Sequence, residues 1–127
     1  ISNSTFLRTG NDGMDLSGSV VLIDNCTAED CGDKGVSIGE ESDATIFQIN
    51  IKGSPIGVAS KDLSVLTIRD IQLEDCDQGF TAYQKKPEYG GGKIIVQSYL
   101  AKNVKRLYNI RKGSSLQLKK KLITDNQ

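Results

Sequence analysis

The residues best suited to chemistry are charged and aromatic side chains that recur in one turn of a repeating pattern. A lysine can hold a sugar carboxylate, a tyrosine ring can stack on a sugar, and a carboxylate can accept hydrogen bonds from hydroxyl groups. The candidate carbohydrate-binding set is Glu40, Lys61, Asp62, Tyr83, Lys85 and Lys86. Glu40 and Asp62 are separated along the chain by the same interval as Lys61 and Tyr83. If successive repeats stack, these side chains gather on one edge.

The same edge could be catalytic. A polysaccharide lyase needs a base, which a lysine with a lowered pKa can supply. We expect Asp62 and Glu40 to favour the charged form of Lys61, which counts against that role. A glycoside hydrolase needs two carboxyl groups about 5 to 9.5 Å apart, and Glu40 with Asp62 is the pair to check. No catalytic residue can be named, and a solvated charged turn without a ligand is the alternative.

A regular spacing of glycines positions this edge. Gly13, Gly35, Gly57 and Gly79 follow one another at equal intervals, and each opens a short alternating segment. The fifth copy is read as residues 106–109, which begins later than the same interval after Gly79 would place it. Residues 85–91, which contain a proline and two glycines, are read as a loop insertion that accounts for the extra length.

A second apolar pattern runs between the glycines, as in Ile68-x-x-Ile71-x-Leu73-x-x-Cys76. Residues two apart share one face of a strand, so Ile71 and Leu73 both point inward. The step of three from Ile68 to Ile71 produces a bend, and each repeat then has three short strands and three turns. The pattern predicts an all-β fold, a right-handed parallel β-helix solenoid of about six rungs of roughly 22 residues.

One stretch carries a family resemblance, Val65-Leu-Thr-Ile-Arg-Asp-Ile-Gln-Leu-Glu-Asp-Cys-Asp-Gln-Gly-Phe80. It resembles a generic repeat of the pectate-lyase-like parallel β-helix superfamily, and the resemblance covers about residues 1–112. It implies a fold rather than a substrate. More loosely, residues 32–40, 57–64 and 82–90 are similar to β-helix repeats of secreted bacterial proteins that carry spore-coat-kinase-like domains. That second resemblance supplies no catalytic residue.

The repeat already runs at Ile1, so we expect residues 1–127 to form a single β-helix domain that is a fragment of a larger protein. Residues 115–127 keep the apolar pair Leu116 and Leu118 and then place Lys121 in the column of Tyr99. This indicates an incomplete last rung or a cap. The other domains of the parent chain are then expected partners.

The net charge of zero hides a strong asymmetry. Residues 1–91 contain 7 basic and 15 acidic residues, whereas residues 92–127 contain 9 basic residues and one acid, Asp125. A basic end invites a nucleic-acid partner, but no recognised binding motif accompanies it, so no nucleic acid is expected. No stretch approaches the roughly 20 apolar residues of a membrane span.

Metal and thiol chemistry have little support. The chain has no histidine, and its three cysteines, Cys26, Cys31 and Cys76, are expected to be buried and unpaired. We expect no cofactor, with calcium as the alternative, because oxygen ligands could gather in an acidic set near the glycine column. That set is Asn11, Asp12, Asp15, Asp30 and Asp33.

The sequence therefore predicts an extracellular or cell-envelope β-helix module for carbohydrate binding or scaffolding, with an acidic polysaccharide as the expected ligand. The alternative is a polysaccharide lyase or glycoside hydrolase with a cleft beside the loop at residues 83–92. A cleft would favour the enzyme, whereas a flat, evenly charged flank would favour the scaffold.

Overall fold

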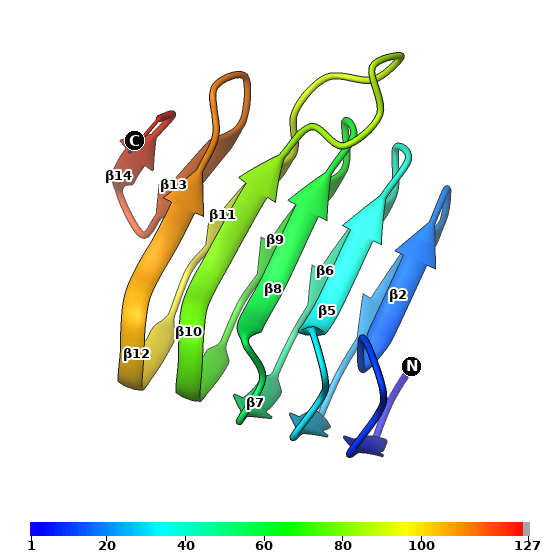
Figure 1. Ribbon diagram of the computed structural model, residues 1–127, viewed down its shortest axis with the longest axis vertical. Coiled ribbons are helices and arrows are strands. Elements are labelled where there is room, and N and C mark those ends of the chain that lie inside the picture. Colours follow the sequence, from blue (N-terminus) through cyan, green and yellow to red (C-terminus); the bar gives the residue numbers. More distant parts are fainter. Residues whose placement is uncertain (126–127) are drawn as a thin grey trace.

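The structure, a computed structural model, describes residues 1–125 as short strands that coil into a stack (Figure 1). The strands form three ladders, in which strands from successive coils lie side by side. The first ladder contains β1 (Thr5–Leu7), β4 (Cys26–Glu29), β7 (Ile49–Lys52) and the start of β10 (Ile71–Tyr83) and β12 (Tyr99–Ile110). The second contains β2 (Met14–Ser17), β5 (Lys34–Gly39), β8 (Ile56–Lys61) and the end of β10 and β12.

The third ladder closes each coil. It contains β3 (Val20–Ile23), β6 (Asp43–Ile46), β9 (Val65–Ile68), β11 (Lys93–Val96), β13 (Ser115–Leu118) and β14 (Lys121–Ile123). Every pairing is parallel except that of β13 with β14, which is antiparallel. The all-β parallel solenoid predicted from the sequence is confirmed. Residues 1–125 complete five coils rather than about six, because the chain turns back after Leu118 and lays Ile123 beside Leu116.

The inward columns follow the predicted spacing. Val36 pairs with Val58, and Val58 pairs with Phe80, each one repeat further along the chain, and all three side chains are fully buried. Ile49 and Ile71 form another such column. Stacking like side chains in this way buries one continuous core along the axis. The three cysteines lie in it as free, buried thiols.

The fifth copy of the glycine segment was assigned to the wrong register. Phe80 pairs with Tyr108 and Ala82 with Ile110, so the true copy lies one position later than the predicted one. Arg106 therefore pairs with Gln78, outside the core, and not with the glycine column. The reason is burial, because the predicted register would place Asn109 opposite the fully buried Ala82.

The glycine column is explained by close approach between coils. A Cβ atom on Gly57 would lie 2.6 Å from Leu73 Cδ2 and 2.7 Å from the carbonyl oxygen of Gly79. Both contacts are shorter than van der Waals distance, and one of them involves backbone that the ladder holds in place. Glycine at this corner lets the leucine fill the interior.

Replacing Gly57 by alanine should therefore destabilise the coil. We expect Gly57→Ala to lower the free energy of unfolding by about 1–3 kcal/mol, the usual cost of overpacking a tight core. Gly10→Ala is the matched control, because a Cβ at Gly10 meets nothing within 4 Å. Urea unfolding measures both, and equal midpoints for Gly57→Ala and the unsubstituted chain would contradict the close-approach explanation.

Candidate functional site

The predicted site residues lie where the second ladder turns into the third. Tyr83 ends β10 and pairs with Lys61 at the end of β8, as the repeat spacing predicts. The turn residues Glu40 and Asp62 have positive φ angles of 54° and 56°. The structure divides the set between two cavities. A small cavity of about 150 Å³, called the loop cavity below, is lined by Asp15, Leu16, Ser17, Gly39, Glu40, Lys61, Asp62, Lys85 and Lys86.

Asp62 anchors the inserted loop. Its side chain is almost completely buried, and Oδ1 accepts hydrogen bonds from the backbone N–H groups of Lys85 at 2.7 Å and Lys86 at 2.9 Å. Its second oxygen, Oδ2, is buried and has no hydrogen-bond partner among residues 1–125. The carboxylate thus holds the start of the loop against the coil and keeps one acceptor oxygen unused.

Glu40 forms an ion pair with Lys86 across the loop cavity. The hydrogen bond from Lys86, followed by that from Ser17, lowers the pKa of the Glu40 carboxyl below its ordinary value. Glu40 and Asp62, the predicted hydrolase pair, are therefore both bound to groups of the inserted loop. The lowered pKa of Glu40 is the opposite of the raised pKa that a general acid requires.

Lys61 differs from the sequence-based expectation. Burial lowers the pKa of its ammonium group, and the nearby charge of Lys85 lowers it further. The expected acid partner is absent because the Asp62 carboxylate points to the loop amides, and no ion pair of Lys61 occurs within residues 1–125. Its aliphatic stem packs on Gly39, where a Cβ would lie 2.9 Å from Lys61 Cε.

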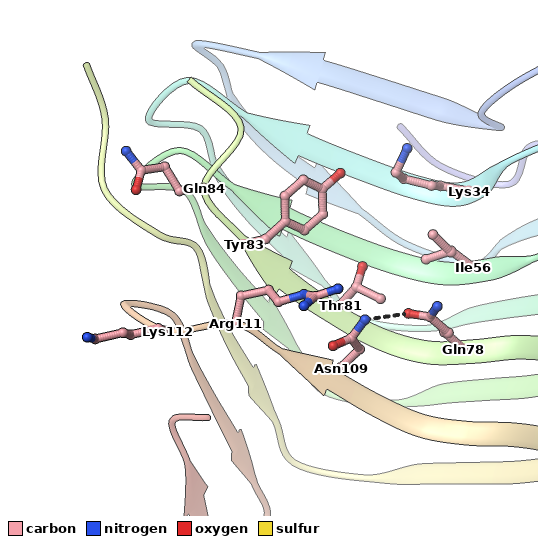
Figure 2. Close-up of a pocket in the computed structure, with 9 residues that line it drawn as sticks. All are labelled: Lys34, Ile56, Gln78, Thr81, Tyr83, Gln84, Asn109, Arg111 and Lys112. Carbon is pink, nitrogen blue, oxygen red and sulfur yellow. Dashed lines mark hydrogen bonds between the residues drawn. The ribbon is translucent and has the colours of Figure 1, made fainter. Parts of the chain in front are cut away.

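The larger cavity, called the outer-face cavity below, has a volume of about 640 Å³ and lies over the outward side of the second ladder (Figure 2). The side chains that line it come from β5, β8, β10 and β12 and from the residues that follow β10 and β12. β10 supplies three of them, Gln78, Thr81 and Tyr83. The full lining is Lys34, Ile56, Gln78, Thr81, Tyr83, Gln84, Asn109, Arg111 and Lys112.

Polar groups in this cavity are partly engaged with the protein. Asn109 Nδ2 donates a hydrogen bond to Gln78 Oε1 at 3.1 Å, the dashed line in Figure 2. Thr81 Oγ1 donates to the carbonyl oxygen of Val58 at 3.1 Å. The carbonyl oxygen of the Asn109 side chain is buried without a partner in the described part of the chain. Burial also raises the pKa of the Tyr83 phenol, so the hydroxyl stays a neutral donor at pH 7.

Two members of the acidic set proposed for calcium, Asp12 and Asp33, pair with Lys34. Its Nζ lies 2.7 Å from Asp33 Oδ2 and 3.9 Å from Asp12 Oδ1, and its backbone N–H donates to Asp12 Oδ1 at 3.1 Å. Burial alone would lower the pKa of Lys34, but the hydrogen bond to Asp33 and the charges of Tyr83 and Asp12 outweigh it and raise the pKa.

The carboxylates of Asp33 and Asp12 therefore balance the positive charge of the Lys34 ammonium group. Within residues 1–125 no group of three or more histidine, cysteine, aspartate or glutamate side chains is placed to hold a metal ion. The acidic set of Asn11, Asp12, Asp15, Asp30 and Asp33 thus gives calcium no geometric support. No helix in the same range has the length and apolar character needed to cross a membrane.

Most of the outer-face cavity was not predicted from the sequence. Of its lining, only Tyr83 belongs to the predicted site. The repeat spacing could have placed Ile56 beside Gln78, because each residue comes immediately before a glycine of the column. The two residues are partners in the ladder. Asn109 could not be placed on this face until the register of β12 was known.

Comparison with known proteins identifies the coil. The family model described as a right handed beta helix region matches residues 1–127. Searches of curated proteins and of solved structures gave no match.

Loss of the Asp62 carboxylate should loosen the inserted loop. We expect Asp62→Ala to speed hydrogen exchange at the amides of Lys85 and Lys86 and to lower the free energy of unfolding by about 1–3 kcal/mol, because two N–H groups lose their acceptor. Asp62→Asn is the control, since its amide oxygen can still accept and asparagine tolerates a positive φ. Unchanged exchange in Asp62→Ala would show that the carboxylate does not hold the loop.

The lowered pKa of Lys61 predicts a defined titration. In NMR of ¹³C-methylated lysines, Lys61 should titrate below the ordinary lysine pKa, and Lys85→Met should raise the pKa of Lys61 by removing a like charge. The folded chain releases this proton at lower pH than the unfolded chain does. This residue's contribution to stability therefore becomes more favourable as the pH rises toward the ordinary lysine pKa. With Lys112→Met as control, a Lys61 signal that titrates at or above the ordinary lysine pKa would refute the assignment.

Proposed function

The chain belongs to the right-handed β-helix family, and we propose that it is a carbohydrate-binding module of the extracellular space or cell envelope whose outer-face cavity takes an acidic polysaccharide. The observation that carries the proposal is the lining of this cavity. One aromatic ring, Tyr83, lies among amide and hydroxyl groups on a rigid ladder.

The size and chemistry of the cavity suit a sugar unit. Its volume of about 640 Å³ lies within the range of small-ligand sites. A sugar presents an apolar C–H face and a rim of hydroxyl groups. The half-buried ring of Tyr83 can cover the C–H face, and the amide group of Gln78 in the same lining can form hydrogen bonds with hydroxyl groups.

The charge of the lining supports an acidic ligand. Three of the nine lining residues are basic, Lys34, Arg111 and Lys112, and none is acidic. Arg111 and Lys112, which follow β12, form one end of the cavity. A guanidinium group binds carboxylates in a bidentate manner, so this end suits the acid group of a sugar.

A polysaccharide lyase is the second candidate, favoured by Lys61. Its lowered pKa makes a neutral, proton-accepting amine more accessible, and its strand position pairs with that of Tyr83 in the outer-face cavity. A glycoside hydrolase has less support, because both candidate carboxylates hold groups of the inserted loop.

Replacing the ring should abolish most of the binding. We expect Tyr83→Ala to weaken the affinity for an acidic polysaccharide by about tenfold or more, because a buried stacking face worth roughly 1–3 kcal/mol is lost. Tyr89→Ala is the matched control, since Tyr89 lies outside the cavity lining. Isothermal titration calorimetry with polyuronate and neutral glucan fragments measures both variants.

Equal affinity of Tyr83→Ala and Tyr89→Ala would contradict the proposed site, as would equal binding of neutral and acidic fragments. The lyase alternative is tested on the same glycans by following the absorbance of unsaturated products. If the chain cleaves these glycans and Lys61→Met abolishes the cleavage, the protein is a lyase and not a binding module.

A further inference from the structure

The last strand of the first ladder has an open edge. Among residues 1–125, β12 pairs only with β10, and Figure 1 shows β12 as the last strand of the front row. The third ladder differs, because β14 covers β13. The part of β12 considered below is residues 99–107, called the open edge.

Along the open edge, residues that belong to the inward columns are more exposed to solvent than their partners in the preceding coil. Ala101 is exposed, whereas its partner Leu73 in the preceding coil is almost completely buried. Val104 is half-buried, and its partner Cys76 is buried. A cavity of about 540 Å³ follows this edge, lined by Tyr99, Leu100, Ala101, Asn103, Val104, Lys105, Leu107 and Lys119. One further strand would restore the burial that the earlier coils have.

The backbone of the open edge presents hydrogen-bonding groups outward. The N–H of Ile71 donates to the carbonyl oxygen of Ser98 in the next coil at 3.2 Å. Tyr99 occupies the same column in β12, so its N–H points beyond the last coil. Alternate residues of a strand direct their N–H groups to the same side, which adds Ala101. An added strand can form backbone hydrogen bonds with such an edge.

Charge specifies the strand that would fit. β10 already shows how a neighbour pairs with this sequence, because Lys102 lies 3.9 Å from Glu74 and Lys105 lies 3.3 Å from Asp77. These lysine side chains are 81% and 80% exposed, so they can also reach a strand on the other side. Residues 93–121 contain nine basic residues and no acid.

We propose that the open edge binds an extended, acidic segment of a partner protein, which adds as a further parallel strand. The segment would place apolar side chains over Tyr99, Ala101 and Val104 and carboxylates beside Lys102 and Lys105. A second copy of this chain is a poor complement, because residues 1–11 contain no acid and would bring Arg8 to the basic edge.

The test uses a peptide with the sequence of β10, the strand that pairs with the opposite edge of β12. A fluorescent peptide with the sequence of residues 71–83 and Cys76→Ser is titrated with the chain of residues 1–127, and binding is followed by anisotropy. The matched peptide carries Glu74→Gln, Asp75→Asn and Asp77→Asn. We expect the acidic peptide to bind at least about tenfold more tightly and to weaken as salt is added.

Substitutions at Ala101 locate the binding edge. Ala101→Pro removes an outward N–H without removing a bond to β10, whereas Ala101→Val keeps it. We expect the proline variant, checked for folding by circular dichroism, to bind the acidic peptide about tenfold more weakly than the valine variant. If the proline variant does not fold, the peptide pair alone decides.

Three results would overturn the proposal. The first is the absence of an anisotropy change with the acidic peptide up to millimolar chain, and the second is equal binding of the acidic and amide peptides. The third is sedimentation of the chain alone as a dimer that excludes the peptide, because a second copy would then occupy the edge.

Discussion

The close approach of successive coils is the constraint on which every other feature depends. Parallel strands about 4.8 Å apart leave no room for mismatched side chains, so each inward column must hold residues whose volumes fit their neighbours. At the corner before Val58 the fit is tight, because the carbonyl of Gly79 and the side chain of Leu73 both lie close to Gly57. A side chain at this corner would push two coils apart, and the ladders on either side would lose register.

The same constraint explains where function is found. The interior is filled, so ligand chemistry is restricted to outward columns, to turns and to the loop that leaves the repeat. Tyr83 still pairs with Lys61, one regular repeat earlier, whereas Lys93 pairs with Val65, so the extra residues lie between Tyr83 and Lys93. Asp62 holds the start of this insertion through two backbone N–H groups. The insertion forms one wall of the loop cavity, beside the outer-face cavity.

Much of the fold could be predicted from the sequence because burial repeats with a fixed period. The columns that contain Val36, Val58 and Phe80 follow directly from the repeat spacing. The step across the insertion could not be counted reliably, because Arg106, Leu107 and Tyr108 each fit a loose pattern. Burial distinguishes these registers. In the observed one, Tyr108 pairs with Phe80 and the polar Asn109 stays out of the core.

The site was harder to predict than the fold. The spacing correctly paired Lys61 with Tyr83, yet it could not show that the Asp62 carboxylate turns toward the loop, nor that Lys61 consequently lacks an acid partner. Side-chain direction within a turn depends on positive φ angles and on backbone groups brought from distant residues. Neither leaves a periodic signal. Asn109 was hidden for a different reason, since its place on the outer face depends on the corrected register.

The register of the coils can be measured by NMR spectroscopy through backbone proton contacts between neighbouring strands. The account predicts nuclear Overhauser effects linking Val58 with Phe80, and Phe80 with Tyr108, since these residues are ladder partners in the second ladder. Contacts from Phe80 to the backbone of Leu107 as its partner, or sequential contacts typical of helix in place of those between coils, would contradict it.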